Sequence, residues 1–398
     1  MKSIARMPHA VASRDNPSDL MAQIRPLLPL IEANAELAER QRKPVDCVIE
    51  ALKKTDVFRA FVPARWGGLE LDLQTFLDIG IVVGEACTST GWITTFYMEH
   101  NWLLSQFPEA TQAEIFSEQP FVLAPASISP TGKAQRVDGG FILDGRWAWG
   151  TGIMHADWVF LNGMVAGDKP EPRLFLTQAH HVEIEDTWHV AGMSGTGSND
   201  MIAKQLVIPE RFSEPLGGMC VGRGSGVTQN SVPIFRAPMV PLQCLTAAAP
   251  AVGAARRALS LFRERIQSRV LYGSQGTQSQ QQAAHIRLGT AASHIEMAET
   301  QLRQVAREVE QWCQREDSCP HIERARMRLQ IANAVRTCRD SITRLMEASG
   351  AGAHMKSSPM QRLQRDINTL SCHTVFDLDI GSENLGRMML GLKPATSV

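Results

Sequence analysis

Hydrophobic positions along the first part of the chain recur at the spacing of amphipathic helices. Apolar residues three and four apart run through 20–41 and again through 73–87. Asp72 immediately precedes the second segment, where a carboxylate can accept hydrogen bonds from the free N–H groups of a first helical turn. We therefore predict a helical N-terminal region over residues 1–120.

The pattern changes at Phe121, where short alternating or wholly apolar runs begin, separated by Gly, Pro and Asp. Asp138, Gly139 and Gly140 give the signal of a tight hairpin turn. Because these runs stand together between two helical regions, they predict an antiparallel sheet over 121–215 and argue against a dinucleotide-binding parallel sheet. The individual runs are 121–129, 134–150, 157–167, 173–177, 181–186 and 200–209.

After Pro233 the helical spacing returns. Three long segments each carry one apolar stripe whose members are three or four residues apart. Such stripes are typical of helices in an up-and-down bundle, so we predict a C-terminal bundle over 216–398 and interpret the stripes as core. The stripes are Leu245, Ala248, Val252, Ala255, Leu259, Phe262 and Ile266; Ala291, Ile295, Ala298, Leu302, Val305, Val309 and Trp312; and Met327, Ile331, Ala334, Cys338, Ile342 and Leu345.

The three regions together predict an α+β fold: an N-terminal helical domain (1–120), a middle antiparallel β domain (121–215) and a C-terminal helical bundle (216–398). Composition agrees with a large core, since 44% of the 398 residues are hydrophobic and 20% are charged. The chain has 40 Lys and Arg against 41 Asp and Glu, with no long run of one sign. It therefore offers no basic face for nucleic acid or an anionic membrane, and we expect a small, weakly charged ligand.

Cysteine and histidine usage excludes several kinds of site. The 8 cysteines form no C-x-x-C pair, none of the 11 histidines belongs to an H-E-x-x-H motif, and no G-x-S-x-G elbow occurs. We expect reduced, mostly buried thiols, no metal and no hydrolase chemistry. The sequence contains no apolar segment of signal-peptide length at its start and no apolar run long enough to span a membrane, which predicts a cytoplasmic protein.

Two glycine-containing motifs are candidates for ligand binding. Gly195-Thr196-Gly197 lacks the third glycine and the following helix of a dinucleotide fingerprint, so we interpret it as a turn. Trp147 and Trp149 lie on one predicted strand just before Gly150-Thr151-Gly152, beside a hydroxyl and free backbone amides. This surface suits a planar ring system, although a pair of tryptophans in the sheet core explains the local sequence equally well.

The order of helical region, small β domain and helical bundle resembles the acyl-CoA dehydrogenase fold, and parts of the sequence resemble it too. Residues 58–63, FRAFVP, followed by Trp66-Gly67-Gly68, resemble its N-terminal signature. Residues 269–273, RVLYG, together with Gln280, resemble the segment that contacts flavin across a subunit interface. The resemblance spans nearly the whole chain from about residue 20 onward.

Within that fold the chain resembles the flavin-dependent monooxygenase branch, the oxygenase components of two-component aromatic hydroxylases. The C-terminal stretch with Arg365-Asp366 and His373 is the most branch-specific part. Two positions depart from the branch: Ser194 stands where relatives more often show Arg, and Gly150 stands where they often carry Ser or Thr. The other matching segments are 89–102, 145–158, 186–198, 348–351 and 359–366.

The position of the catalytic base separates the two activities of this fold. An acyl-CoA dehydrogenase needs a carboxylate that removes the α-proton of a thioester. Aligning the family's C-terminal segment on 384–387 places Ile380 at that position, flanked by Asp377, Asp379 and Glu383. The resemblance therefore favours oxygenation. A dehydrogenase with a base elsewhere and an N-oxygenase of the same fold are the alternatives.

The resemblance implies an enzyme that hydroxylates an aromatic or heteroaromatic, phenol- or indole-like molecule. A separate NAD(P)H flavin reductase would supply reduced FMN or FAD, and molecular oxygen would add to give a C4a-hydroperoxyflavin. Water must be excluded from that site, because loss of hydrogen peroxide wastes the oxygen. The family assembles as tetramers, so a homotetramer is implied as well.

Two histidines are the expected catalytic residues. The resemblance implies that His373 deprotonates or orients the substrate, since an imidazole titrates near neutral pH. His100 is the second candidate, expected to line the pocket from the N-terminal helices. The alternatives are a helix-surface or capping histidine for His373 and a packing role for His100.

The expected cofactor-binding residues come from both later regions. Ser127, Ser129 and Thr151 are expected to donate hydrogen bonds to the flavin edge, unless their hydroxyl groups simply bond to nearby backbone. Trp149 and Gly150 belong to the same turn as Thr151 and would lie against the ring. From the bundle, Arg269 is expected to neutralise a flavin phosphate and Tyr272 to contact the flavin of a neighbouring subunit.

Overall fold

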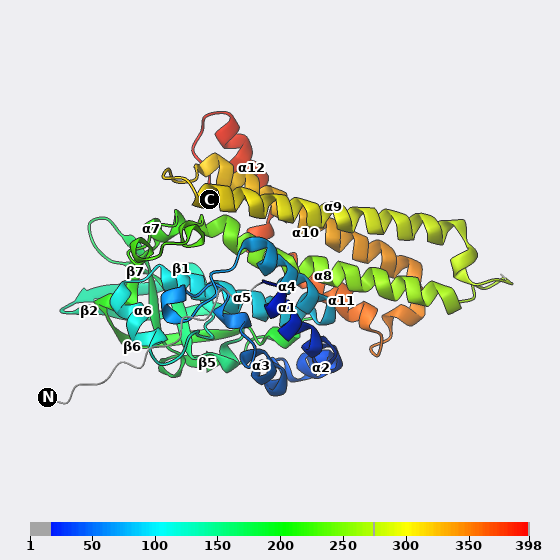
Figure 1. Cartoon of the computed structure of the whole chain (residues 1–398), viewed down its shortest axis with the longest axis horizontal. Coiled ribbons are helices and arrows are strands. Elements are labelled where there is room, and N and C mark those ends of the chain that lie inside the picture. Colours follow the sequence, from blue (N-terminus) through cyan, green and yellow to red (C-terminus); the bar gives the residue numbers. More distant parts are fainter. Residues whose placement is uncertain (1–16, 274, 397–398) are drawn as a thin grey trace.

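The computed structural model of the chain describes residues 17–273 and 275–396, in which helices precede and follow one sheet (Figure 1). This is the predicted order of elements. The N-terminal helices are α1 (Pro17–Ile24), α2 (Leu28–Gln41), α3 (Asp46–Lys53), α4 (Leu73–Ala86), α5 (Thr88–Ser105) and α6 (Glu109–Phe116).

Local chemistry sets the limits of these helices. The helix predicted over 20–41 is divided at Arg25–Leu27, because Pro26 has no N–H for the helical ladder and Pro29 lies in the first turn of α2. Asp72 caps α4 as predicted, since its carboxylate accepts a hydrogen bond of 2.8 Å from the Thr75 N–H.

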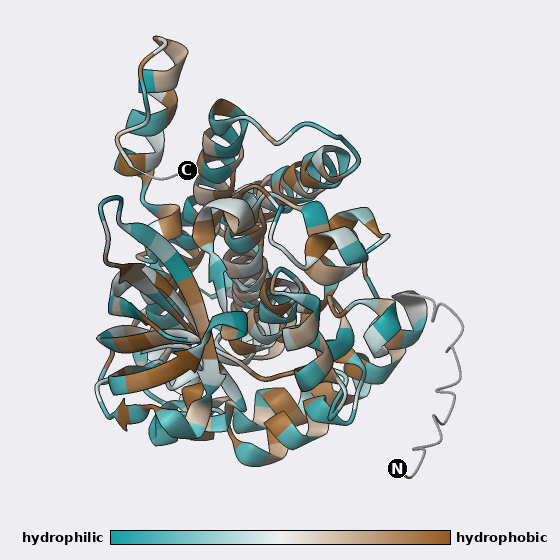
Figure 2. Ribbon diagram, turned by 90° about the vertical axis from the view of Figure 1, so that its left-hand side faces the viewer, coloured by the Kyte–Doolittle hydropathy of each residue, from teal (hydrophilic) through white to brown (hydrophobic). Residues whose placement is uncertain are grey.

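The middle region is a sheet of seven strands in the order β5-β6-β2-β1-β3-β4-β7. In the side view the sheet lies beside the long helices, and its strands carry both hydrophobic and hydrophilic positions (Figure 2). The sequence pattern located six of the strands and missed the short β7. The strands are β1 (Ala126–Val137), β2 (Gly140–Gly150), β3 (Trp158–Val165), β4 (Glu171–Gln178), β5 (Glu183–Glu185), β6 (Asn199–Pro209) and β7 (Ser213–Pro215).

The prediction of an antiparallel sheet was wrong in one respect, because the sheet is mixed. β2 pairs antiparallel with β1, with Val137 opposite Gly140 across the predicted hairpin turn. β3 pairs with β1 in parallel, starting with Ala126 opposite Phe160. β2 and β3 lie on the two sides of β1 and run in opposite directions. Since β2 is antiparallel to β1, β3 is parallel to it. Alternation of apolar residues reports the face of a side chain and carries no information on strand direction.

The C-terminal helices form the predicted bundle. α8, α9 and α10 run side by side in alternating directions (Figure 1). The three predicted stripes are buried, apart from Leu259 and Trp312, which are partly buried. The helices of this region are α7 (Leu216–Cys220), α8 (Met239–Ser268), α9 (Gln282–Cys313), α10 (His321–Ser349), α11 (Pro359–Leu370) and α12 (Leu378–Met389).

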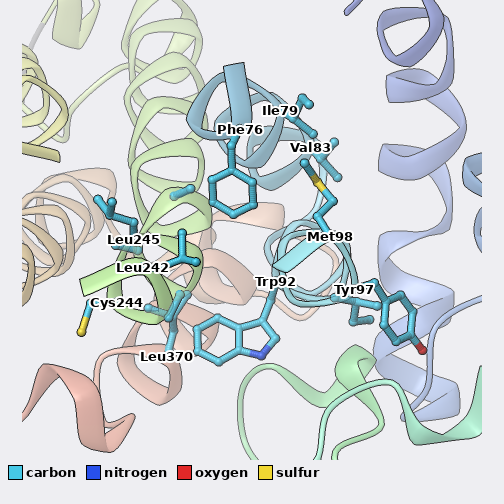
Figure 3. Close-up of a cluster of buried hydrophobic side chains, with 14 of the residues drawn as sticks. Phe76, Ile79, Val83, Trp92, Tyr97, Met98, Leu242, Cys244, Leu245 and Leu370 are labelled. Atoms are coloured by element: carbon cyan, nitrogen blue, oxygen red, sulfur yellow. The ribbon is translucent and has the colours of Figure 1, made fainter. Parts of the chain in front are cut away.

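Helix α5 lies at the centre of the protein, and all its residues except Phe96 are buried. A helix buried all round is typical of the core of a large protein. It crosses α4 and α8 at small residues: a Cβ atom on Gly91 would lie 2.6 Å from the Cα of Gly84 and 3.3 Å from the Cβ of Pro250. Figure 3 shows side chains of these three helices packed together, with Trp92 among them.

Two further expectations concern cysteines and membrane spans. All eight cysteines are free, and five of them are buried, while Cys47 and Cys372 are exposed. Among residues 17–273 and 275–396, no helix combines the length and the apolar character that a membrane span requires.

Candidate functional site

Helix α5 holds the turn that follows β2 through side-chain hydrogen bonds. The Tyr97 hydroxyl donates to the Gly152 carbonyl at 2.5 Å, and Trp92 Nε1 donates to Thr151 Oγ1 at 3.2 Å. Gly152 has φ +74°, and a Cβ atom there would lie 2.3 Å from the Tyr97 hydroxyl oxygen, so only glycine fits. The predicted Gly-Thr-Gly turn is therefore fixed against the central helix.

His100 faces the sheet from α5. Its Nδ1 lies 2.5 Å from the Ala124 carbonyl oxygen, and its ring contacts Phe96 edge-on at a centroid distance of 5.4 Å. Because a carbonyl can only accept, Nδ1 carries the hydrogen and Nε2 keeps the lone pair of the neutral ring. Burial lowers the pKa of His100 to about 4, so the imidazole is neutral at neutral pH and able to accept a proton.

His373 reaches the same place from the other end of the sequence. It precedes the short turn Thr374–Phe376, and its ring lies 5.4 Å from that of Trp92 and 6.4 Å from that of Phe96, centroid to centroid. Burial and the positive charge of Arg328 lower its pKa to about 4, although part of the residue remains accessible to solvent. The two predicted histidines thus both lie against Phe96, and both are neutral at neutral pH.

The two tryptophans of β2 have different roles. Trp147 is fully buried in the sheet core, where its Nε1 donates to the Asn162 carbonyl at 2.7 Å. Trp149 is 64% exposed and has φ +67°, in a register irregularity between Trp147 and Gly150. A bulge with a left-handed residue costs energy and re-aims a side chain. The core interpretation therefore holds for Trp147, while Trp149 presents a free aromatic surface.

Three hydroxyl groups continue from this turn to the loop before β6. Thr151 Oγ1 lies 3.1 Å from Ser198 Oγ, which lies 2.8 Å from Thr196 Oγ1. At one end of this series of hydrogen bonds, the Trp92 N–H can only donate. At the other end, the Met193 carbonyl, 2.9 Å from Thr196 Oγ1, can only accept. Each hydroxyl therefore donates to the next. Thr151 donates to Ser198 and keeps an acceptor lone pair for a ligand, so it is placed to accept from a ligand and not to donate as expected.

The remaining predicted residues of the sheet differ in exposure. Ser127 is buried, and its hydroxyl has no hydrogen-bond partner within residues 17–273 and 275–396, whereas Ser129 is exposed. A Cβ atom on Gly150 would lie 2.9 Å from the Met201 sulfur, which explains glycine at this departure from the family. Ser127 is thus the better placed of the two serines to bond a ligand.

Arg269 and Tyr272 lie elsewhere. They belong to the connection 269–281 between α8 and α9, which Figure 1 shows at the end of the bundle away from the sheet. Tyr272 is fully exposed. A single chain therefore does not bring these two residues to Trp149.

The guanidinium group of Arg269 is held by neutral acceptors. Nη1 donates to Gln278 Oε1 at 3.0 Å and to the Ala348 carbonyl at 2.8 Å. In the described part of the chain it forms no ion pair with a carboxylate, so its charge is free to attract an anion.

The branch-specific pair Arg365-Asp366 positions the loop before β6. Asp366 Oδ1 accepts a hydrogen bond of 2.6 Å from the Met193 N–H, and Arg365 Nη1 donates to the Ala191 carbonyl at 2.5 Å. Burial raises the pKa of Asp366 to about 6. Ser194, the departure from the family, turns its hydroxyl to the Val190 carbonyl at 2.9 Å. The loop is a braced turn that leads into a strand, as predicted.

The sequence analysis missed Phe96 and Glu99, which complete this cluster. Glu99 Oε2 lies 3.4 Å from His100 Nε2, and burial raises the pKa of Glu99 to about 8. One signal was available for each residue. Trp92, Phe96 and His100 are spaced four apart and so share a helix face, and Glu99 is the single acidic residue of α5.

The carboxylates near the dehydrogenase base position do not enter the cluster. Asp377 caps α12 by accepting a hydrogen bond of 2.9 Å from the Ile380 N–H. Asp379 and Glu383 are exposed on the same helix.

These residues suit a flavin. Trp149 offers an exposed ring, Ser127 an unpaired hydroxyl and Thr151 a free acceptor. A planar heterocycle with polar edges needs these groups. No cluster of metal-ligating side chains occurs among residues 17–273 and 275–396.

Comparisons with known proteins bear on the fold and the family of the chain. A family model described as acyl-CoA dehydrogenase, C-terminal domain, matches residues 245–378. The chain is 34% identical to the pigment production hydroxylase of a Rhodococcus species over 377 residues, which cover 94% of this chain and 97% of that protein. It is 32% identical over 392 residues to the flavin-dependent monooxygenase, oxygenase subunit HsaA, of Mycobacterium tuberculosis, covering 98% and 99%.

Solved structures show the same relationship. The crystal structure of the M. tuberculosis HsaA monooxygenase matches with a TM-score of 0.89 at 32% identity, over 96% of this chain and 99% of that one. XiaF from a Streptomyces species, in complex with FADH2 and glycerol, also has a TM-score of 0.89, at 27% identity over 96% and 98%.

Proposed function

This chain belongs to the oxygenase components of two-component flavin-dependent monooxygenases with the acyl-CoA dehydrogenase fold, and we propose that it hydroxylates a phenol- or indole-like small molecule. Reduced flavin from a separate reductase, reacting with molecular oxygen, supplies the oxygen atom in this family. What the chain itself contributes is binding, orientation, exclusion of water and proton transfer.

The pairing of His100 with His373 around Phe96 carries the proposal. Both imidazoles are neutral at neutral pH, the ring of Phe96 contacts that of His100, and the ring of Trp92 contacts that of His373. A phenolic hydroxyl bound there would meet a proton acceptor, and loss of its proton makes the ring electron-rich. Relatives named p-hydroxyphenylacetate 3-hydroxylase, resorcinol hydroxylase and indole-3-acetate monooxygenase support an aromatic substrate.

The flavin contacts follow from the same geometry. Trp149 would stack on the ring, Thr151 would accept from a flavin N–H, and Ser127 would donate to a carbonyl edge. Arg269 and Tyr272 would meet the phosphate end of a flavin held by a neighbouring subunit, in a homotetramer. Whether that flavin is FMN or FAD is tested by comparing the affinities of the two reduced forms.

A reductase-coupled assay tests this function. The purified protein, an NAD(P)H flavin reductase and either FMN or FAD are mixed with a panel of phenols and indoles, and oxygen uptake, hydroxylated product and hydrogen peroxide are measured. The expected result is product that forms only with the reductase and in proportion to oxygen consumed. Oxygen uptake that yields only hydrogen peroxide with every substrate would contradict the proposal.

The acyl-CoA dehydrogenase alternative has one observation in its favour. Glu99 is a buried carboxyl group beside the aromatic cluster and is the candidate for a base from another position. That activity would bleach bound oxidised flavin when a saturated acyl-CoA is added under nitrogen. If no saturated acyl-CoA of any chain length bleaches the flavin, the dehydrogenase alternative is excluded.

An N-oxygenase of the same fold would want a polar pocket. The rings that contact His100 are those of Phe96 and Phe160, and Trp92 lies against Phe96, which favours an aromatic substrate over an amino sugar. Adding amino-sugar nucleotides to the same assay distinguishes the two.

Two broader expectations remain proposals. The division of the chain into 1–120, 121–215 and 216–398 is tested by the positions at which limited proteolysis cuts. A cytoplasmic location is tested by cell fractionation.

A further inference from the structure

Glu99 carries a carboxyl group that no hydrogen bond compensates. It is fully buried, and neither Oε1 nor Oε2 has a hydrogen-bond partner in the described part of the chain. By contrast, Glu214 accepts bonds from the N–H and hydroxyl of Ser225, and Glu310 accepts one from the Leu73 N–H. Burying a carboxyl group without such partners is unfavourable, so packing alone does not explain Glu99.

The polar group that Glu99 does reach is the imidazole of His100. Oε2 lies 3.4 Å from Nε2, while Nδ1 is committed to the Ala124 carbonyl at 2.5 Å. The nitrogen that keeps the lone pair is therefore the one beside the carboxyl group. An ionised carboxylate this close to the ring favours the imidazolium that forms when Nε2 accepts a proton.

We propose that Glu99 is a positioning residue that acts through His100, so that the two side chains form one proton-accepting dyad for the substrate hydroxyl. The proposal rests on the aromatic hydroxylation proposed above. The substrate O–H bond breaks, an N–H bond forms at Nε2, and the electron pair stays on the substrate oxygen. With Glu99 ionised, dyad and substrate together carry one negative charge before and after the transfer. The imidazolium forms between two anionic oxygens instead of standing alone in a dry site.

The pH at which the dyad becomes active follows from burial. Burial raises the pKa of Glu99 to about 8 and lowers that of His100 to about 4, so the dyad is uncharged at pH 7 and gains its negative charge as pH rises through about 8. Because the groups are coupled, this midpoint belongs to the pair. A kcat governed by the dyad rises across that window.

No other group on the elements around α5 explains a rise near pH 8. The pKa of His373 is lowered to about 4 and that of Asp366 is raised to about 6, and burial raises the pKa values of Cys87 and Tyr97 above their ordinary values. Burial is the cause that raises the pKa of Glu99, and the ionisable group beside its carboxyl oxygens is the His100 imidazole, at 3.4 Å. Charged residues on the packed elements pair elsewhere: Arg59 with Asp56, Asp78 with Arg303, and Arg365 with Glu39.

The test compares Glu99→Gln with wild type. Glutamine keeps the size of the side chain but does not ionise. Glu310→Gln is the matched control, since Glu310 is a partly buried carboxyl group whose pKa is also raised by burial, on α9. In the reductase-coupled assay, wild type and control are expected to gain kcat as pH rises through about 8. Glu99→Gln is expected to lose that rise and to fall roughly 10-fold to 100-fold below wild type at about pH 9, with KM little changed.

A second readout needs neither flavin nor turnover. A nitrophenol bound to the protein absorbs differently as phenol and as phenolate, so its spectrum reports the proton acceptor directly. The bound probe is expected to ionise at a higher pH in Glu99→Gln than in wild type or Glu310→Gln. The NMR signals of the His100 imidazole, followed across the same pH range, are expected to shift near pH 8 in wild type and to stay constant in Glu99→Gln.

Failure of the dyad and failure of the proposed function give different results. If phenols are hydroxylated and Glu99→Gln keeps the wild-type pH profile and probe ionisation, the dyad is overturned and the function stands. If no aromatic compound is hydroxylated or bound, the function falls, and the NMR titration still decides whether Glu99 and His100 are coupled. Unchanged His100 signals across pH 8 in wild type would overturn the coupling itself.

Discussion

The cluster on α5 is predicted to act on the substrate and the connection 269–281 to contact flavin, and the two regions differ in how completely a single chain builds them. On α5, the side chains of Trp92, Tyr97 and His100 all bond to the sheet or to the turn after β2. In the connection, Tyr272 is fully exposed and Arg269 bonds only to neutral acceptors. The α5 side chains thus have their partners within one chain, whereas the connection offers the exposed ring of Tyr272 and a charge on Arg269 that no carboxylate of the described residues pairs with.

This difference indicates which region serves proton transfer and which serves cofactor binding. Proton transfer needs groups held to within a few tenths of an ångström, so it is built on the most buried helix. Holding a phosphate needs charge more than exact placement, and an exposed loop of a second subunit can supply it. If so, substitutions on α5 should act on chemistry, and substitutions in 269–281 should act on cofactor retention alone.

The largest effect is expected from His100→Ala. Removing the proton acceptor should lower kcat for hydroxylation by about 10²–10⁴-fold, in the range of general acid–base catalysis. Reduced-flavin binding should change little, because the ring contacts Phe96 and the Ala124 carbonyl and does not touch Trp149. The assay is product formation under reductase coupling. His321→Ala, an exposed histidine at the start of α10, is the control. Wild-type kcat in His100→Ala would remove α5 from the chemistry.

The next effect is a pH-dependent change in stability. The folded-state pKa of Glu99 is raised to about 8, so the folded protein binds more protons than the unfolded chain between the ordinary value and that pH. Stability from this group therefore falls as pH rises through about 8. The Glu99→Gln variant should not show this fall. Its free energy of unfolding, measured by urea denaturation, should rise relative to that of the wild type by roughly 2 kcal/mol between pH 6.5 and 8. The exposed Glu50→Gln should show no such gain. Parallel curves for wild type and Glu99→Gln would mean that Glu99 is already ionised at neutral pH.

The two histidines act at the acid end of the same curve. Their folded-state pKa values, about 4, lie below the ordinary value, so the stability they contribute is present above about pH 6.5 and is lost as pH falls through 4. Acid unfolding of the wild type should therefore steepen below pH 6.5. Measurements for Glu99→Gln are best read above that range.

A smaller effect is expected at the flavin wall. Trp149→Ala should weaken reduced-flavin binding about 10-fold, through lost stacking and burial. It should not lower the melting temperature, because the ring is 64% exposed and the residue has φ +67°. Trp147→Phe is the matched control. It should lower the melting temperature and leave flavin binding unchanged, since the Trp147 ring is buried. Anaerobic fluorescence titration and thermal melts measure both. Equal flavin affinity in Trp149→Ala would place the flavin elsewhere.

The smallest effect on stability is expected from Tyr272→Ala. A fully exposed side chain should change the free energy of unfolding by less than about 0.5 kcal/mol. Flavin dissociation should become faster in the oligomer and remain unchanged in any monomeric fraction separated by size exclusion. A large loss of stability would show that the connection is already packed against something in solution.

Much of the fold was predictable because its signals are local. The stripes of α8, α9 and α10 repeat over about thirty residues, long enough for helical spacing to be unambiguous. The Asp72 cap and the turn at Asp138 act within three or four residues of themselves. The parallel pairing of β1 with β3 depends instead on how the chain passes over β1 after Gly150, which no periodicity records.

Only part of the site could be predicted, because the contacts that assemble it join segments far apart in the sequence. His100 and His373 came from a resemblance, and their meeting across Phe96 depends on segments far apart in the sequence. The sequence does not distinguish the environments of Trp147 and Trp149. The register irregularity between the buried Trp147 and the exposed Trp149 arises from the pairing of β2 with β6. Glu99 was overlooked because a single acidic residue in a helix is ordinarily solvent-exposed. Its burial is a property of the packed protein.

The burial of α5 on every side also bears on how the enzyme fails when heated. Amide hydrogens exchange with solvent through local opening at exposed segments but only through global unfolding at the centre of a core. The amides of α5 should therefore be among the last to exchange, and the side-chain cluster on α5 should stay in place until the whole chain melts. The connection 269–281 can loosen first, so a warmed enzyme is expected to shed flavin while its chemistry remains intact, and adding flavin should restore it.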